Sequence, residues 1–423
     1  MTSAPSTPAT SGALAEPVVP VRGRWIAMLV LANLAVFMGF FTPIQQLLPE
    51  QIKAIDPDHK EAMLAWVTGI GAFAAVVVNP LAGALSDRTT ASTGRRWRWL
   101  GGRRHPWTLG GALLGGAALV FLSGQRSIVG VAIGWVLAQT FLNTMLASLT
   151  AAVPDRVPVA QRGAVSGWVG IPQVLGLVLG VALVTLLVTG VAAGYVAIAV
   201  AVVVLALPFP LLTPDDPLPP EEKPAFSLRR FWVSPREYPD FAWTFGTRFL
   251  VFLGNALGTL YLLYFLTDQV HYHDPDTGLL VLILIYTVAL IATTVLSGRR
   301  SDRTGRRRVF VVVAGVVMAV AALLLAVAPT WPVAMVAAGI MGGGYGIYLA
   351  VDNALVTQVL PAVRDRAKDL GVVNIASSAP QVLAPVIAAP VVRSLGGYPV
   401  LYLLTAVVTL LGSVFVYRIR SVA

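Results

Sequence analysis

The sequence predicts an all-α integral membrane protein with twelve transmembrane helices arranged in two pseudo-symmetric six-helix bundles. Three observations support this fold class: the apolar composition, twelve long apolar runs, and motifs that recur in the second half of the chain. Of the 423 residues, 57% are hydrophobic and 12% are charged, whereas a soluble domain typically carries about a quarter charged residues. A lipid bilayer is the solvent that suits such a chain.

Twelve apolar runs are long enough to cross a bilayer, because a spanning helix needs about 20 mainly apolar residues. Charged and turn-forming residues mark their ends. The predicted spans cover residues 25–48, 62–85, 107–124, 127–152, 164–189, 191–212, 240–267, 277–297, 309–328, 331–358, 369–392 and 397–417.

The spans divide the chain into four parts. Residues 1–21, rich in Pro, Ala, Ser and Thr, are expected to form a disordered cytoplasmic tail. Residues 22–212 and 240–423 hold six spans each and predict an N-terminal and a C-terminal bundle. Residues 213–239 form a proline-rich cytoplasmic linker, in which the sequence SLRRFW is either a plain connector or a segment at the membrane surface.

The distribution of positive charge predicts the orientation. With both termini in the cytoplasm, 25 of the 30 Lys and Arg residues lie in cytoplasmic segments and four lie in outer loops, as the positive-inside rule requires. A multi-pass protein of the cell membrane is therefore expected. The net charge of +10 follows from these short loops, so we expect no nucleic-acid partner.

Cofactor and metal sites are not expected. The chain has no cysteine and four histidines, which excludes thiolate chemistry and cysteine metal sites. The sequence HYHDPD at 271–276 could suggest metal binding, but a solvated loop is the preferred interpretation. Seven acids, Glu50 and Asp276 among them, fall in the predicted outer loops.

Several short motifs recur about 210 residues apart. The sequence SDRT occupies 86–89 and 301–304, and PQV occupies 172–174 and 380–382. Because the matches keep their order, they indicate an internal repeat.

The loop after the second span, with the pattern G-x-L-x-D-R-x-x-x-x-x-G-R-R, resembles that of the major facilitator superfamily. The match is carried by Gly83, Leu85, Asp87, Arg88, Gly94, Arg95 and Arg96, and it is echoed by Asp302, Arg303, Gly305, Arg306 and Arg307. Within that superfamily, SDRT followed by GRRHPW at 102–107 is similar to the pattern of sucrose–proton symporters and the glycoside–pentoside–hexuronide carriers. An additional stretch, RRWRWLGG, separates the two motifs here.

This resemblance implies a mechanism in which two bundles rock about a central site and expose it to each side in turn. It implies that the first, fourth, seventh and tenth spans line the cavity, that a monomer suffices, and that the substrate is a small molecule. The Asp and Arg of the loop motif would latch the bundles together on the cytoplasmic side. Asp87 and Arg88 are expected to contact the segment 368–371, while Arg95, Arg96, Arg103 and Arg104 are expected to serve topology alone.

Only two charged residues lie well inside a predicted span, Arg248 in the seventh and Asp352 in the tenth. Charge at that depth costs about 2.5–3.5 kcal/mol on insertion scales. Each residue is eight positions from the cytoplasmic end of its span, so both lie about 12 Å deep and can form an ion pair. A substrate or proton-coupling site and a static structural pair are both consistent with this pattern, and Asp352 could instead pair with Arg299 or Arg303 at the inner gate.

Other polar residues at membrane depth are further candidates for contact with substrate or protons, although such residues also hold helices together. In the second half these candidates are Asn255, Tyr345, Tyr348 and Asn353, and in the first half they are Asn33, Gln139, Asn143 and Gln173. Their amide, hydroxyl and aromatic groups suit a polar organic solute such as a sugar.

The preferred functional hypothesis is a secondary active transporter that takes up a small polar solute, for instance a sugar or glycoside, together with protons. A proton-antiport exporter of drugs or metabolites on the same fold is the alternative. An enzyme is disfavoured, because the sequence offers one buried carboxylate and no cluster of metal ligands at membrane depth.

Overall fold

The computed structural model describes residues 17–90, 102–216, 236–359 and 366–420. These residues form an all-helical structure that includes twelve helices long and apolar enough to cross a membrane. The predicted fold class is therefore confirmed. Most of the predicted tail and linker, including SLRRFW, lies outside the described residues.

The described residues of the first half form eight α-helices and a π-helical turn. Their bounds are α1 Gly23–Thr42, the π-turn Pro43–Leu47, α2 Leu48–Ile55, α3 Lys60–Asp87, α4 His105–Ser123, α5 Ile128–Arg156, α6 Val159–Leu187, α7 Val191–Ala206 and α8 Pro208–Leu212.

In the second half, the part of the chain that the structure describes forms seven α-helices and a short final 3₁₀ turn. Their bounds are α9 Pro239–Leu260, α10 Leu262–Asp268, α11 Pro275–Thr304, α12 Arg307–Val327, α13 Trp331–Val359, α14 Arg366–Ser394, α15 Gly397–Phe415 and the 3₁₀ turn Val416–Arg418.

Several of the described spans are interrupted; the sixth, for example, passes from α7 to α8 around Leu207. The first span continues from α1 through the π-turn into α2, so that one crossing covers Gly23–Ile55. Pro43 opens this turn; its missing N–H and its ring prevent the regular α-helical bond to the preceding turn. The seventh span joins α9 to α10 around Tyr261. The first and seventh spans extend beyond their predicted ends.

The two halves meet along two seams, α3 against α14 and α6 against α11. The SDRT motifs end α3 and α11, and the PQV motifs lie in α6 and α14. Each SDRT helix therefore packs against the PQV helix of the other half, as a two-fold relation between the repeats requires.

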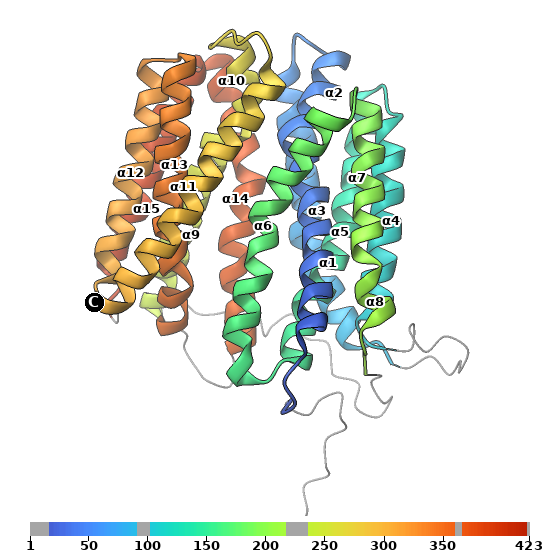
Figure 1. The fold of residues 1–423 in the computed structure, drawn as a ribbon. Coiled ribbons are helices and arrows are strands. Elements are labelled where there is room, and N and C mark those ends of the chain that lie inside the picture. Colours follow the sequence, from blue (N-terminus) through green and yellow to red (C-terminus); the bar gives the residue numbers. More distant parts are fainter. Residues whose placement is uncertain (1–16, 91–101, 217–235, 360–365, 421–423) are drawn as a thin grey trace, which may run out of the picture.

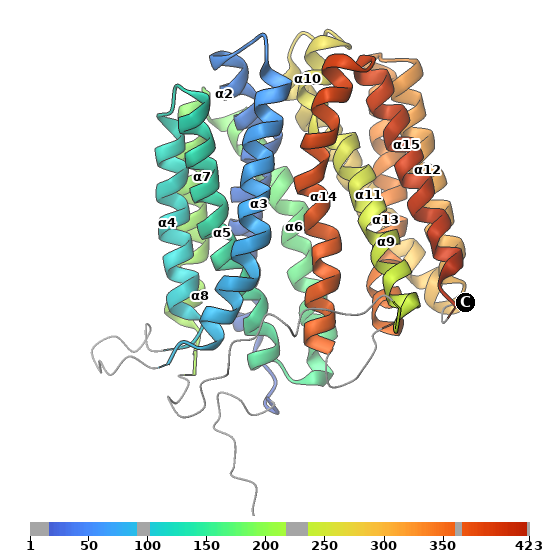
Figure 2. The same cartoon turned by 180° about the vertical axis from the view of Figure 1, so that it is seen from behind.

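We call the end where α1 begins and the C-terminus lies the terminal end, and the opposite end, with α2 and α10, the distal end. In Figure 1 and Figure 2 the seam helices approach each other at the distal end and spread apart towards the terminal end.

Close helix packing within the second half depends on glycine. A Cβ atom at Gly342 of α13 would lie 2.1 Å from the backbone oxygen of Tyr286 in α11. Thr293 and Thr294 of α11 donate to the carbonyl oxygens of Gly343 and Gly346 at 2.9 and 3.1 Å. Small residues and interhelical hydrogen bonds of this kind are what hold helices together in lipid.

We expect Gly342→Ala to destabilise the protein by about 1–3 kcal/mol, because the added methyl group meets backbone atoms that cannot rotate away. A lower melting temperature of the purified protein in detergent would show it. Gly343→Ala is the matched control, since its Cβ would meet only the Thr293 side chain at 3.6 Å. Equal melting temperatures for both variants would contradict the close approach.

Candidate functional site

Arg248 and Asp352 form an ion pair between α9 and α13. Arg248 Nη1 lies 2.7 Å from Asp352 Oδ2, and the two side chains are 10% and 3% exposed. The sequence places Arg248 and Asp352 at equal depth in their spans, which makes an ion pair possible, and the structure contains this pair. The pairing lowers the cost of burying either charge, and removal of one partner would leave the other uncompensated.

Aromatic rings surround the ion pair. The hydroxyl group of Tyr348 donates to Asp352 Oδ1 at 2.8 Å. The guanidinium carbon of Arg248 lies 5.3 Å from the centre of the Phe252 ring. Phe252 makes edge-to-face contacts with Tyr345 and Tyr348, whose rings stack on each other. The predicted residues Tyr345 and Tyr348 therefore join the charged pair.

Phe252 was not among the predicted site residues. It follows Arg248 by four positions in α9 and so shares its helix face. That spacing is the signal that could have identified it, because an arginine in an apolar span favours an aromatic face for its guanidinium group.

One hydrogen-bond donor of the ion pair is unused. Arg248 Nε is buried and has no hydrogen-bond partner among the described residues. Leaving a buried donor unsatisfied costs about 1–3 kcal/mol, and more for a charged group. An acceptor oxygen on a bound solute would remove that cost.

Asn255 lies apart from the ion pair, two helical turns further along α9. Its Oδ1 atom accepts a hydrogen bond of 2.9 Å from the Tyr286 hydroxyl group in α11. The side chain of Asn353 is outside the description, although its backbone belongs to α13. The structure thus brings three predicted residues, Tyr345, Tyr348 and Asp352, to Arg248 and leaves Asn255 in a neighbouring contact.

The predicted polar residues of the first half form smaller, separate contacts. Asn143 Nδ2 donates to Gln139 Oε1 at 2.9 Å within α5, and Asn143 Oδ1 accepts from Asn79 in α3 at 3.4 Å. Asn33 donates to the Leu29 carbonyl of its own helix. Gln173 of α6 is exposed. No described contact brings these residues to Arg248.

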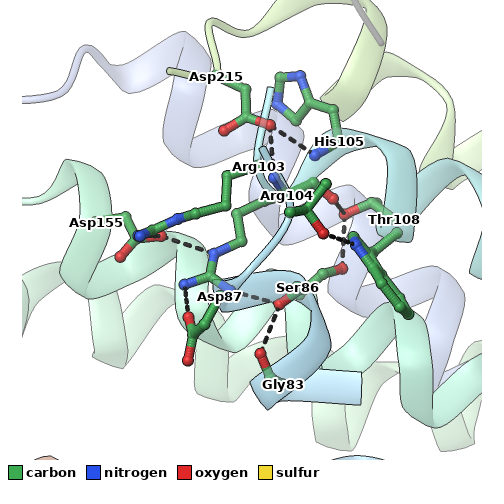
Figure 3. A network of polar contacts seen from close by, with 12 residues as sticks. Gly83, Ser86, Asp87, Arg103, Arg104, His105, Thr108, Asp155 and Asp215 are labelled. Carbon is green, nitrogen blue, oxygen red and sulfur yellow. Dashed lines mark hydrogen bonds and ion pairs between the residues drawn. The ribbon is translucent and has the colours of Figure 1, made fainter. Parts of the chain in front are cut away.

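A second cluster of charges lies at the terminal end of the first half (Figure 3). Arg104 binds Asp155 at 2.7 Å and binds both Asp87 and Ser86 at 2.5 Å. Arg103 binds Asp155 at 2.6 Å. Burial opposes the charged form of Arg104, but the carboxylates of Asp155 and Asp87 outweigh it and raise the pKa of this guanidinium group above its ordinary value.

The linker begins by capping α4. Asp215 Oδ2 accepts hydrogen bonds of 2.7 Å from the backbone N–H groups of Arg104 and His105, which satisfies two of the free donors at this helix start. His105 Nε2 lies 3.1 Å from Thr213 Oγ1. Arg156 of α5 pairs with Asp216. These contacts attach residues 213–216 to the first half.

The structure corrects the prediction that Arg103 and Arg104 serve topology alone, because both are buried in ion pairs. The sequence did contain a signal for these ion pairs. Gly-Arg-Arg-His-Pro places two cations where a helix begins, and the helix dipole disfavours positive charge there unless carboxylates compensate it. Asp155 and Asp215 supply that compensation, and sequence reasoning missed both.

The predicted contact of the latch residues with the segment 368–371 lies outside the described residues and stays a prediction. In this conformation the partner of Asp87 is Arg104 of its own half, and the side chains of 368–371 are not described. Arg88 Nε is buried without a described partner, and Gly83 accepts a hydrogen bond from Ser86. Gly94 and Arg95 lie outside the described residues, as does the side chain of Asp302, and Arg303 is exposed.

Polar contacts join the two halves at the distal end. Lys60 Nζ lies 2.6 Å from Asp268 Oδ1, and Tyr398 donates to Asp268 Oδ2 at 2.9 Å. The hydroxyl groups of Tyr261 and Tyr264 each donate at 3.0 Å to backbone carbonyl groups of the first half, those of Glu61 and Pro49. Sequence reasoning did not predict these contacts.

We expect Arg104→Gln to destabilise the protein by about 2–3 kcal/mol, below the full cost of truncating a buried pair because Asp87 is half exposed. Thermal unfolding in detergent measures the change. Arg306→Gln removes an exposed charge near the repeated motif and should leave the melting temperature within a degree or so, as surface substitutions usually do. A shift of equal size in both variants would argue against the network.

Comparisons with known proteins agree with this architecture. The profile of the Major Facilitator Superfamily matches residues 26–284 and 244–423. A search of curated protein sequences finds no significant match.

Three solved transporters have a similar fold at low identity. The nucleoside transporter NupG, as a point mutant, has a TM-score of 0.71 at 13% identity over 94% of this chain and 100% of its own. The human organic anion transporter MFSD10 (TETRAN) has a TM-score of 0.67 at 18% identity, with coverage of 94% and 100%. A POT family transporter in complex with 5-aminolevulinic acid has a TM-score of 0.73 at 11% identity, with coverage of 94% and 97%. With a family profile that matches nearly the whole chain and a fold that agrees with it, the protein belongs to the Major Facilitator Superfamily and is a transporter of small solutes.

Proposed function

We propose that this protein is a proton-coupled symporter of the cell membrane that takes up a small polar organic solute, with a sugar or glycoside as the preferred class. The observation that carries the proposal is the buried Arg248–Asp352 pair with its unused Nε–H donor. Ionisable residues inside a membrane protein are costly, and they commonly mark substrate pathways and proton relays.

The positive-inside rule supports an orientation with the terminal end in the cytoplasm. The distal end then faces outward, and the contacts of Lys60, Tyr261 and Tyr264 with the opposite half close it. At the inner side Asp87 pairs within its own half. This combination fits a state that is closed to the outside, from which an importer releases its solute.

Asp352 is the proposed proton carrier. A proton on its carboxyl group would cancel the attraction to Arg248 and leave the guanidinium group free to bind the solute. Loss of the proton to the cytoplasm would restore the ion pair and displace the solute. Tyr348, which donates to Asp352, would keep the carboxyl group in place while its charge changes.

The proposed solute carries acceptor oxygens and a flat or ring-shaped apolar face. The Nε–H group of Arg248 would bind an oxygen, and the rings of Phe252 and Tyr345 offer faces against which a sugar ring can pack. The similar structures are those of a nucleoside transporter, an organic anion transporter and a transporter in complex with 5-aminolevulinic acid, and all of these solutes are polar organic molecules.

A proton-antiport exporter remains the second candidate, because a single carboxylate that exchanges its proton for solute works in either direction. The direction of pH-driven flux in sealed vesicles separates the two. Uptake with an inward proton gradient supports the symporter, and expulsion supports the exporter.

We expect Asp352→Asn to retain exchange of solute across the membrane and to lose accumulation driven by a pH gradient, because the amide cannot release a proton. Reconstituted vesicles measure both processes in one preparation. Asp58→Asn removes an exposed carboxylate and is the control. Unchanged accumulation in Asp352→Asn would exclude this residue as the proton carrier.

A thermal-shift screen against sugars, glycosides, nucleosides and common drugs should identify the solute, because a ligand at 100 times its dissociation constant stabilises a protein by about 2.7 kcal/mol. We expect Arg248→Lys to lose that stabilisation, since lysine keeps the charge near Asp352 and lacks the Nε–H group. A full ligand-induced shift in this variant would remove Arg248 from the binding site.

A further inference from the structure

Two acidic side chains meet across the halves at the distal end. Gln46 in the π-turn donates to Asp276 Oδ1 of α11 at 3.4 Å. Glu50 follows Gln46 by one helical turn, and its carboxyl group is within side-chain hydrogen-bonding reach of both Asp276 and Gln46. Two carboxyl groups can share a hydrogen bond only when one of them carries a proton.

The surroundings offer little compensation for two negative charges. Glu50 Oε1 is buried and has no hydrogen-bond donor among the described residues. Lys53, one turn along α2, is the cation that acts on Glu50, and it is exposed. Gln46 is held by Thr185 of α6, whose hydroxyl group donates to Gln46 Oε1 at 3.3 Å.

A buried tyrosine lies within electrostatic range of Glu50. Tyr195 of α7 is 0% exposed, its hydroxyl group has no described partner, and Glu50 acts on it electrostatically. The Tyr195 hydroxyl group and Glu50 Oε1 thus both lack a hydrogen-bond partner among the described residues, and Tyr195 lies near enough to Glu50 to feel its charge.

Asp274, two residues before Asp276, does not compete for that proton. It is exposed, and the hydrogen bonds that it accepts from Thr277 hold its pKa below the ordinary value. The pair of Glu50 and Asp276 is therefore distinct from the solvated acid beside it.

We propose that Glu50 and Asp276 form a proton-binding site that closes the distal gate. One proton shared between the two carboxyl groups joins α2 of the first half to α11 of the second. When the proton leaves, two negative charges face each other and the gate opens. This inference rests on the alternating-access function proposed above, but it is independent of the solute and of the role of Asp352.

The sign of the pH effect follows from linkage. Closure brings the carboxyl groups together, so the closed state binds the proton more tightly than the open state, and acid favours closure. The Lys60–Asp268 pair, by contrast, is an ordinary ion pair that holds the same gate without needing a proton. A metal cation fits the site less well than a proton, because the Gln46 amide group and the Tyr195 hydroxyl group present donors, whereas hard cations require six or more oxygen ligands.

The absence of cysteine from the chain permits a direct test on the full-length protein. Spin labels attached at Arg126→Cys and Thr330→Cys, both exposed at the distal end in different halves, report the separation of the halves by pulsed electron paramagnetic resonance. We expect the long-distance population to grow from about pH 5 to about pH 9, with the open-to-closed ratio changing up to about tenfold per pH unit for one linked proton.

Glu50→Gln and Asp276→Asn should each keep the short distance over that whole range, because an amide group donates the hydrogen bond that the shared proton supplies and does not titrate. Two variants are tested so that misfolding of either one does not decide the result. Asp58→Asn, which removes an exposed acid at the same end, should retain the response of the unmodified protein.

Three outcomes would overturn the proposal: a distance that does not change with pH, a response that persists in both Glu50→Gln and Asp276→Asn, or closure driven by Na⁺ at constant pH. A response lost only in Asp352→Asn would assign the titration to the central pair and would also overturn it. Because no solute is added, failure here leaves the proposed transport function to its own tests.

Discussion

The ion pair between Arg248 and Asp352 is the interaction around which the rest of the structure is arranged. Neither charge is stable alone at that depth, so the two helices that carry them must meet. The pair lies wholly within the second half. A rocking motion between the halves would therefore leave it intact.

The cations at the two ends of the molecule are neutralised by carboxylates from different halves. At the terminal end, Arg103 and Arg104 are neutralised by carboxylates of the same half. At the distal end, Lys60 is neutralised by Asp268 of the opposite half. The first arrangement stiffens one bundle, and the second ties two bundles together. Motion is thus resisted most where polar contacts cross the seams, and the proposed proton site lies at that position.

The twelve spans and the depth of Arg248 and Asp352 could be predicted from sequence, because hydropathy and helical rise are local properties. Partners of the loop arginines could not, since Asp155 and Asp215 are far away in the chain and packing alone chooses them. Glu50 and Asp276 were assigned to outer loops for a third reason. The first predicted span ends at 48 and the eighth begins at 277, whereas α2 includes Glu50 and α11 includes Asp276. The prediction missed that these helices continue past the apolar stretch.

The cap that Asp215 provides for α4 has a consequence for how the chain is divided. The start of the connector is structurally attached to the first bundle, because Asp215 caps α4 and Asp216 pairs with Arg156. If the protein were expressed as two separate pieces, the chain would have to be divided after Asp216. Otherwise the first piece would lose Asp215, whose carboxylate caps α4.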